Sequence, residues 1–445
     1  MTRRATERFC AQHLAAVEIS VGVPEGPLSS KSTNVRVKCP IDPSHSVWLH
    51  ALQRHVKRCQ ASKEVIRSPW HVPDINLVRF GLDPSVTSGA PITFEDYQKC
   101  IAFVDKFYQN EIQGTKYTEI PLRQLQHEGL ERRLNELSNK KHAIQQGSLI
   151  SAVEDAGLLL CENSFVEFGA GRGELSRYLN QAILHKYNNE PTHPPSFLLI
   201  DRCGMRMKFD SKIVKDSEDL GSKHPTTPIV HRYKIDIKDL DLRKEDNNQL
   251  RRRSDAKGSL VAISKHLCGA ATDLTIQCLM NYYRNRNDND EDKMDLAGIV
   301  IALCCRHRCS YSSYPLEYLT KHMNIDPRGF EILCKMSSWA VCGRRHQNRD
   351  TSDSGKSEMR VNEDDAELDA DSGDSNDEDN QDGQAHVSGL SISRREEIGM
   401  KVRSIIDYAR VRKLEDQGFQ VELIRYVDKA ISSENVCLVA MPIQK

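Results

Sequence analysis

The stretch Phe165-Val-Glu-Phe-Gly-Ala-Gly-Arg-Gly-Glu174 decides the fold of this chain. Its first four residues have the character of a short buried strand, and three alternate glycines interrupt that strand at once. Helical spacing of apolar residues then resumes at Leu175, Tyr178 and Leu179. A strand that passes through alternate glycines into a helix is typical of the nucleotide-binding turn of a doubly wound α/β sheet. The backbone must come close to a ligand there, and a Cβ atom would block it.

The spacing of these glycines distinguishes two kinds of cofactor site. A dinucleotide fingerprint is G-x-G-x-x-G, whereas this chain has G-x-G-x-G with an acidic residue before it. The shorter spacing is typical of methyltransferases that use S-adenosylmethionine. The cofactor-binding residues predicted in this turn are Glu167, Gly169, Gly171 and Gly173. A structural turn that holds no cofactor is the alternative.

Further apolar runs predict six more strands, at 196–201, 232–237, 259–264, 296–303, 421–426 and 435–441. The central runs are apolar on both faces, as expected of parallel strands that helices cover on each side. An amphipathic helix is expected over 397–416, and only a short loop separates the last two strands, so these should form an antiparallel hairpin. The predicted fold is therefore an α/β, Rossmann-like seven-stranded methyltransferase sheet with a C-terminal hairpin, which dehydrogenases normally lack.

Two acidic residues at predicted strand ends complete the expected cofactor site. Asp201 ends the second strand, where a carboxylate accepts hydrogen bonds from the ribose hydroxyls of a nucleoside. Asp236 ends the third strand, where an acidic residue can meet the adenine amino group. Each residue could instead be an ordinary cap at the end of a strand.

A second motif, Lys265-His-Leu-Cys-Gly-Ala-Ala-Thr-Asp273, follows the fourth predicted strand at the carboxyl edge of the sheet, where substrates bind. Enzymes that methylate an exocyclic base nitrogen usually carry Asn/Asp-Pro-Pro-Tyr/Phe there, and this chain has no such tetrapeptide. Methylation of a ribose 2′-hydroxyl requires that the hydroxyl proton be removed or polarised, which a lysine or a histidine can do. Lys265 and His266 are therefore the predicted catalytic residues, with Asp273 as their orienting partner. Alternatively, Lys265 contacts phosphate and His266 packs structurally.

The segment Leu303-Cys-Cys-Arg-His-Arg-Cys309 ends the fifth predicted strand on the same edge. Its cysteines and histidine suggest a metal site, but adjacent cysteines at a strand end should point to opposite sides. Arginines, in contrast, make good contacts with phosphate. We therefore favour a loop that faces RNA, with Arg306 and Arg308 as its contacts, over a metal cluster.

The N-terminal part of the chain contains the pattern C-x5-H-x9-H-x3-C, formed by Cys39, His45, His55 and Cys59. Two thiolates and two neutral imidazoles complete a closed tetrahedral site for Zn²⁺. A segment this short cannot bury enough apolar surface to fold alone, so the metal would supply most of its stability. We expect a structural zinc finger with no open coordination position.

Changes of pattern along the chain predict its domains. Residues 1–34 hold the remnant of a second finger, 35–62 the zinc finger, 63–150 a helical linker or cap, and 151–445 the catalytic domain. The helical spacing of the linker includes Leu122 and Leu125. An acidic, aperiodic insertion at about 347–391 interrupts the catalytic domain, because it cannot bury enough apolar surface to become ordered.

Composition narrows the class of protein further. The net charge of −1 over 445 residues hides a separation, because the first 60 residues are basic and 363–382 are acidic. Outside the acidic stretch the chain is positive, which suits a polyanionic partner. The 14 cysteines do not resemble a secreted disulfide framework. No run reaches the ~18 apolar residues that a membrane span requires. We expect a soluble intracellular protein, nuclear, cytoplasmic or both, with no membrane partner.

These motifs together resemble the eukaryotic zinc-finger tRNA 2′-O-methyltransferases, which modify the fourth nucleotide, in the acceptor stem. The resemblance covers almost the whole chain except the acidic insertion. It rests on the finger, the glycine turn, the segments 265–273 and 302–309, and Ser433-Glu-Asn-Val at the start of the last strand. It implies S-adenosylmethionine as the methyl donor and the ribose of cytidine or adenosine in certain tRNAs as the acceptor.

The chain departs from the family pattern at two places. The family's preceding C-C-C-H finger survives only as Cys10 and His13, and Arg306 stands where the family's C-C-H-H-R-C pattern has a histidine. An RNA-binding zinc-finger adaptor with an inactive methyltransferase domain is the alternative function, although an adaptor would not need an intact cofactor turn. A nicotinamide-dependent oxidoreductase fits the glycine turn but neither its spacing nor the terminal hairpin.

Overall fold

The computed structural model describes most of the chain, namely residues 36–41, 46–57, 59, 69–78, 91–137, 140–204, 208–219, 227–244, 258–284, 294–320, 325–342 and 386–443. The chain divides into two compact units, Met1–His71 and Val72–Lys445. Cys10, His13 and His45 lie outside the described residues, as does the predicted acidic insertion up to residue 385. No helix in the described part combines the length and the apolar character that crossing a bilayer demands.

In its described residues, the smaller unit contains a two-stranded antiparallel sheet and a short helix. Strand β1 (Arg36–Lys38) pairs with β2 (Ser46–Trp48), and a 3-10 turn, η1 (Leu49–Ala51), leads into α2 (Leu52–Val56). The guanidinium of Arg36 lies 4.9 Å from the centre of the Trp48 ring, and its Nε donates to Ser46 Oγ at 3.1 Å. Both contacts join β1 to β2.

The larger unit is built on a seven-stranded sheet in the order β5-β4-β3-β6-β7-β9-β8. The strands are β3 (Ser164–Phe168), β4 (Ser196–Asp201), β5 (Ile229–Lys234), β6 (Leu260–Cys268), β7 (Leu296–Cys304), β8 (Phe419–Arg425) and β9 (Val436–Pro442). The first five are parallel, and β9 is antiparallel to both β7 and β8. This arrangement confirms the predicted fold, including the terminal hairpin.

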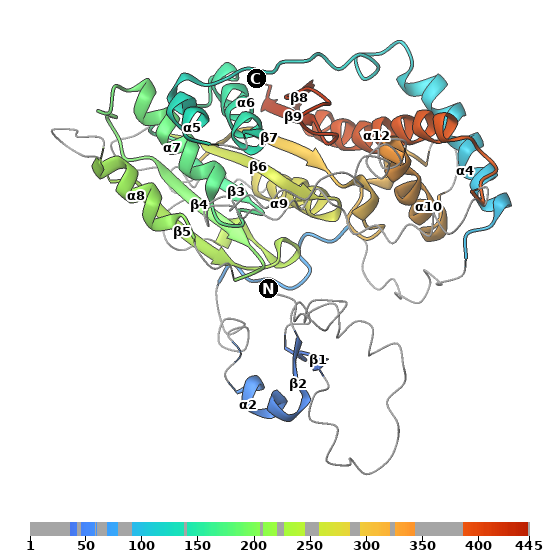
Figure 1. Ribbon diagram of the computed structural model, residues 1–445, viewed down its shortest axis with the longest axis horizontal. Helices are drawn as coiled ribbons and strands as arrows, with labels where there is room; N and C mark the ends of the chain where they lie inside the picture. Colours follow the sequence, from blue (N-terminus) through green and yellow to red (C-terminus); the bar gives the residue numbers. More distant parts are fainter. Residues whose placement is uncertain are drawn as a thin grey trace, which may run out of the picture. The chain divides into compact units, whose positions relative to one another are not determined.

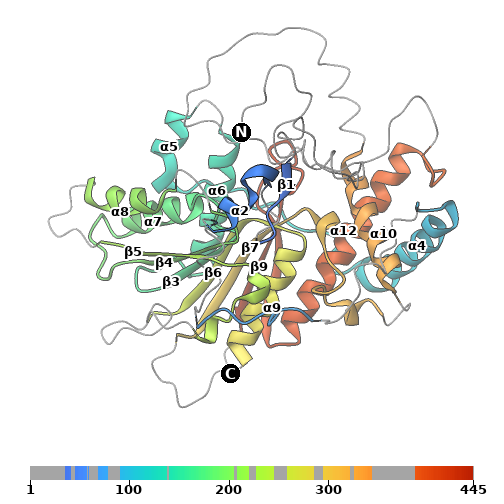
Figure 2. The same ribbon diagram turned by 90° about the horizontal axis from the view of Figure 1, so that it is seen from below.

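Helices cover both faces of the sheet, as Figures 1 and 2 show. One face carries α6 (Lys141–Asp155), α7 (Glu174–Lys186) and α8 (Asp210–Asp219), and the other carries α9 (Ala270–Arg284) and α12 (Ile392–Glu415). The apolar stripe predicted for the last helix is buried throughout, at Ile398, Val402, Ile405, Ile406 and Ala409. Burying such side chains contributes about 1.5–3 kcal/mol for each of the larger ones, so this stripe holds the helix in place.

A further group of helices lies beside α12. It consists of α4 (Phe94–Phe107), the π-helical turn η3 (Tyr108–Ile112), α10 (Pro327–Ser337) and the 3-10 turn η9 (Ser338–Val341). Asp105 on α4 pairs with Arg394 at 2.8 Å and with Lys401 at 2.7 Å, both on α12. The helical segment predicted as a linker or cap therefore packs as part of the larger unit. Shorter helical elements of the described residues are η4 (Glu128–Leu130), α5 (Glu131–Glu136), η5 (Ile237–Asp239), η6 (Leu242–Lys244), η7 (Arg306–Arg308) and η8 (Leu316–Tyr318).

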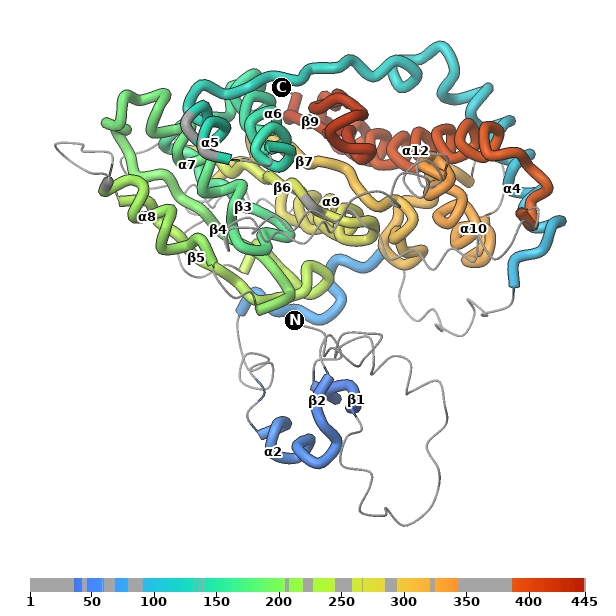
Figure 3. Tube along the Cα trace, in the orientation of Figure 1, coloured from blue at the N-terminus to red at the C-terminus, as the bar shows by residue number. Residues whose placement is uncertain are grey.

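The segment between η3 and η4 differs from the prediction, because it is not helical. It runs from α4 to α5 along the outer strand of the sheet (Figure 3). Leu122 forms a parallel bridge with Arg425, and the amide of Arg123 donates to the carbonyl of Arg425 at 2.8 Å. Leu122 is 50% exposed, so its helical spacing with Leu125 does not reflect a buried stripe. The backbone groups of the β8 edge determine the conformation here.

The third parallel strand also differs, because β5 ends at Lys234 and not near residue 237. This strand lies at the edge of the sheet and its side chains are mostly half-buried, so polar residues such as His231 are tolerated within it. Asp236 therefore follows the strand and caps η5, where its side chain accepts a hydrogen bond from the amide of Lys238 at 3.0 Å.

Candidate functional site

At three places the turn after β3 adopts a backbone conformation that favours glycine. The φ angles are 66° at Gly169, 50° at Gly171 and 84° at Gly173, all in the left-handed region. A Cβ atom at Gly171 would meet nothing within 4 Å, whereas one at Gly173 would lie 3.0 Å from Arg232 and Leu199. Gly171 thus borders open space that a ligand can fill, and Gly173 is required for packing at the start of α7.

Asp201 lies at the end of β4 and contacts this turn directly. One carboxylate oxygen accepts a hydrogen bond from the amide of Gly171 at 2.8 Å, and the other accepts one from the amide of Cys203 at 2.7 Å. Arg232 on β5 donates to the carbonyl of Gly171 at 2.8 Å and forms a two-pronged ion pair with Asp210. The turn is therefore held from two neighbouring strands, and Asp201 retains lone pairs for a further donor such as a ribose hydroxyl.

Glu167 lies beneath the turn. Its side chain is 3% exposed, and one oxygen accepts hydrogen bonds from both the amide and the hydroxyl of Ser176 in the first turn of α7. Burial raises the pKa of this carboxyl group from 4.5 to about 7. The structure therefore places Glu167 as a support for α7, which helps to hold the cofactor turn.

Lys265 lies within β6 and not after it, at an irregularity of the strand. Ser264 pairs with Ile301 and Leu267 with Leu303, so β6 contains one residue more than β7 over this stretch. Such bulges re-aim side chains and are frequent beside active sites. Lys265 is 7% exposed, and its Nζ lies 3.0 Å from Nδ1 of His142 on α6. The side chain of His266 lies outside the described residues.

Asp273 does not lie against Lys265 as predicted. It is 1% exposed on α9, and both of its oxygens accept hydrogen bonds from Arg410 on α12, at 2.8 and 3.1 Å. Lys265 instead contacts His142, a residue that sequence reasoning missed. No spacing relates His142 to the motif, because 123 residues separate the two side chains along the chain.

Arg306 and Arg308, predicted to contact RNA, differ in exposure. Arg306 is 2% exposed and forms ion pairs with Asp407, at 2.7 Å, and with Glu434. This burial argues against the predicted RNA contact, because two carboxylates already occupy the guanidinium. Arg308 is exposed, so its charge remains available to a phosphate.

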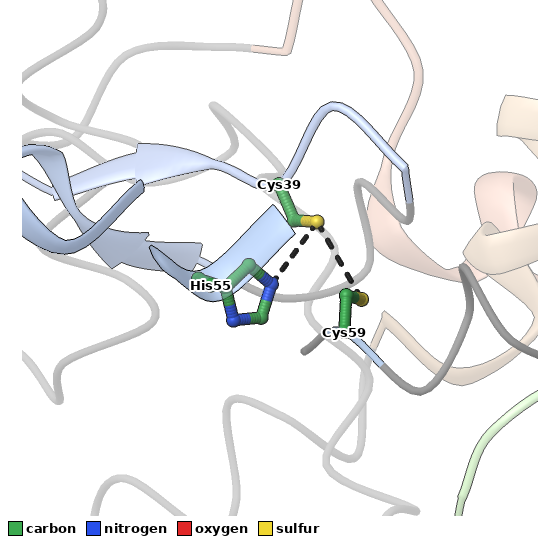
Figure 4. A group of neighbouring side chains, drawn as sticks. All are labelled: Cys39, His55 and Cys59. Carbon is green, nitrogen blue, oxygen red and sulfur yellow. Dashed lines mark hydrogen bonds between the residues drawn. The ribbon is translucent and has the colours of Figure 1, made fainter. Parts of the chain in front are cut away.

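In the smaller unit, the three finger residues that the structure describes converge (Figure 4). His55 Nε2 lies 3.2 Å from Cys39 Sγ, and the sulfurs of Cys39 and Cys59 are 3.8 Å apart. Their ligand atoms all lie within 4.8 Å of one another, and both cysteines are buried. Two thiolates and an imidazole in this arrangement fit a tetrahedral Zn²⁺ site.

Comparison with known proteins finds a matching family for each of the two units. The family described as "U11-48K-like CHHC zinc finger" matches residues 36–60, and the family described as "Methyltransferase TRM13" matches residues 144–441. Curated relatives bear the name tRNA:m(4)X modification enzyme TRM13. The relative from Yarrowia lipolytica is 37% identical over 99% of this chain and 86% of its own length.

The relative from Scheffersomyces stipitis is 36% identical over 98% of this chain and 96% of its own length. The relative from Saccharomyces cerevisiae is 34% identical, over 98% and 92% respectively. These matches confirm the resemblance predicted from the motifs. The chain belongs to the TRM13 methyltransferase family and carries a CHHC zinc finger at its N-terminal side.

Proposed function

We propose that this protein methylates the ribose 2′-hydroxyl of nucleotide 4, a cytidine or adenosine, in the acceptor stem of tRNA. The relatives bear the name tRNA:m(4)X modification enzyme, which supports a tRNA substrate, and the chain spans at least 86% of the relatives described above. The observation that carries the proposal is the placement of the glycine turn and Lys265. They belong to β3 and β6, which are adjacent parallel strands, so both lie toward one edge of the sheet.

S-adenosylmethionine is the expected cofactor, and it supplies an activated methyl group when bound. The open space at Gly171 would take part of it, and Asp201, already fixed against the turn, would accept hydrogen bonds from its ribose. Asp236, which caps η5, is the proposed partner of the adenine amino group. Gly173 and Glu167 would act by holding the start of α7, which follows the turn directly.

The proposed role of Lys265 is to accept the proton of the target hydroxyl. A lysine can do this only as a neutral amine. Its Nζ lies 3.0 Å from Nδ1 of His142, and this contact would hold the nearly buried amine in one orientation. His142 is therefore proposed as the positioning partner of Lys265.

The acceptor stem would be recognised by shape and charge. An A-form helix has a deep major groove that side chains cannot read, so contacts to phosphates and 2′-hydroxyls are expected. Arg308 and the zinc finger are the proposed contributors. Because its substrate is tRNA, we expect the enzyme to act inside the cell, in the nucleus, the cytoplasm or both.

A tRNA with a single 2′-deoxyribose at nucleotide 4 tests the position and the chemistry together. Incubated with the full-length protein and labelled S-adenosylmethionine, it should accept no methyl group. The matched substrate, deoxyribose at nucleotide 5, should be methylated like unmodified tRNA. Label entering the tRNA that is deoxy at nucleotide 4 would show that a base, or another nucleotide, is the acceptor.

Two substitutions of Lys265 separate its proposed role from a phosphate contact. Lys265→Ala should lower the rate of transfer by about 10²–10⁴-fold while S-adenosylmethionine still binds, since general base catalysis contributes that much. Lys265→Arg keeps the charge but cannot give up a proton near neutral pH, so it should be equally inactive. Substantial activity in the arginine variant would mean that Lys265 contacts phosphate. Lys116→Ala is the matched control, because the Lys116 side chain is 56% exposed and pairs with Glu415.

The adaptor alternative predicts a different outcome. An adaptor should bind tRNA but show no binding of S-adenosylmethionine in calorimetry. Binding of the cofactor with a Kd in the micromolar range would exclude it.

A further inference from the structure

Three cysteines gather at the carboxyl ends of the two central strands β6 and β7. Cys268 and Cys304 are register partners at the ends of these strands, and their sulfurs are 3.4 Å apart. Cys305 follows directly, and the three sulfurs lie within 4.8 Å of one another. None of the three belongs to the zinc finger, and the proposed methyl transfer does not use them.

The backbone at Cys305 explains how two adjacent cysteines reach one point. In an extended strand they would lie on opposite faces, which is why the sequence argues against a metal site here. Cys305, however, has φ 43° and ψ 52°, the left-handed conformation that is unfavourable for a residue with a Cβ atom. This turn brings its thiol to the same side as that of Cys304.

A glycine brings the third cysteine into place. Gly269 follows Cys268 with φ +52°, and a Cβ atom there would lie 2.2 Å from the backbone carbon of Arg308. The chain leaving β6 therefore lies directly against the turn at residues 306–308. The Gly269 amide also donates to the carbonyl of Cys304 at 3.4 Å. Cys268 is thus held beside the other two thiols by main-chain packing.

We propose that Cys268, Cys304 and Cys305 bind a second zinc ion as three thiolate ligands, leaving its fourth position to water. Tetrahedral Zn²⁺ with Zn–S bonds of about 2.3 Å separates its ligand sulfurs by roughly 3.8 Å, close to the spacing found here. A disulfide would require an S–S distance of about 2.05 Å, far shorter than 3.4 Å. Soft thiolates select zinc over magnesium or calcium, which prefer oxygen ligands.

Cys309, the remaining cysteine of the motif, accepts a hydrogen bond from Arg410 at 3.1 Å and is not part of the cluster. The site therefore differs from the one that the motif alone suggests, since Cys268 takes the place of Cys309.

The zinc content of the full-length protein tests the proposal. A Cys39→Ser, Cys59→Ser variant removes two ligands of the finger, so zinc that remains after gel filtration belongs elsewhere. In this background, adding Cys305→Gly should lower the bound zinc by one equivalent, and adding Cys342→Ser should leave it unchanged. Cys342 is a half-buried cysteine outside the cluster, which makes it a suitable control.

Glycine at position 305 also separates loss of metal from loss of fold. Glycine accepts φ 43° without strain, so without a metal the substitution should leave the melting temperature unchanged or raise it. If zinc is bound, the melting temperature should fall, and a chelator should lower that of the parent protein to the same value. When cobalt replaces zinc, the thiolate charge-transfer band of the Cys305→Gly variant should be weaker than that of the parent protein.

Three results would overturn the proposal. The zinc content could be the same with and without Cys305→Gly, or the melting temperature of that variant could rise. Freshly purified protein could also contain a disulfide between Cys268 and Cys304. Titration of thiols in denaturant, with and without reductant, detects the disulfide. None of these measurements depends on methyl transfer, so the zinc site can fail while the proposed function stands.

Discussion

The guanidinium of Arg410 and the carboxylate of Asp273 form a two-pronged ion pair in which both side chains are 0% exposed. The pair connects α12 with the first turn of α9, directly after the motif that contains Lys265. Asp407, one turn earlier on α12, pairs with Arg410 at 3.3 Å and with Arg306 at 2.7 Å. Asp273 therefore belongs to a buried charge network that supports the carboxyl edge of the sheet.

Asp273→Asn should destabilise the protein strongly. The change leaves Arg410 buried without its principal counter-charge, and breaking a buried pair in this way typically costs 3–5 kcal/mol. Urea unfolding measures the loss. Glu422→Gln, at the ion pair with Arg123 in which each side chain is 46% exposed, is the control and should cost less than about 1 kcal/mol. Unchanged stability with lost activity would return Asp273 to the catalytic role first predicted from the sequence.

Glu167 should make stability depend on pH. Its pKa is raised from 4.5 to about 7 in the folded protein, mainly by burial. Below pH 4.5 the carboxyl group is protonated in both states. As the pH rises toward 7, the unfolded chain releases a proton that the folded protein retains, so stability falls.

Above pH 7 the free energy of unfolding should be roughly 3 kcal/mol lower than it is well below pH 4.5. Glu167→Gln should not show this decline. The difference in free energy of unfolding between the two proteins, measured by urea unfolding at pH 5 and pH 8, gives the effect directly. If the stability of the two proteins changed with pH in the same way, the prediction for Glu167 would be wrong.

Gly171→Ala should weaken the binding of S-adenosylmethionine by at least tenfold. The added Cβ atom points into the open space that the cofactor is proposed to fill. Gly157→Ala is a matched control, because Gly157 also has a left-handed φ, +71°, and open space around it, but lies after α6. Both variants should lose about 1–2 kcal/mol of stability from backbone strain. Calorimetric titration should show weaker cofactor binding in the first variant only.

Cys59→Ser should separate binding of tRNA from binding of the cofactor. Losing one thiolate should unfold the finger, because the metal supplies most of its stability. We expect the Kd for tRNA to rise tenfold or more and the Kd for S-adenosylmethionine to stay unchanged. His50→Ala, which alters the same unit but leaves the four predicted ligands in place, should change neither constant. Equal tRNA affinity in all three proteins would remove the finger from substrate recognition.

The sequence predicts the sheet well because its strands are buried and apolar on both faces. β3 is buried along its whole length, and the glycines after it allow only one kind of turn. The edge strand β5 is placed less well, since half-buried side chains leave a weak pattern. Bulges leave no pattern either, so the sequence places Lys265 after its strand and not within it.

The contacts of the site are harder to predict, because they join residues far apart in the chain. The sequence alone suggests that Arg306 contacts RNA, because its partners Asp407 and Glu434 lie 101 and 128 residues further along the chain. His142 lies in a segment that reads as a linker, yet it contacts Lys265. The finger ligands, in contrast, are close in sequence, and spacing alone identifies them.

The irregular segment 113–127 has a consequence for where the chain can be shortened. It donates to and accepts from the outer backbone groups of β8, and the side chain of Gln124 accepts a hydrogen bond from the amide of Asp428. A fragment limited to residues 144–441, the part that matches the methyltransferase family, would leave this strand uncovered. Bare strand edges pair with one another. Such a fragment should therefore self-associate, and the smallest well-behaved catalytic fragment should begin near Val72.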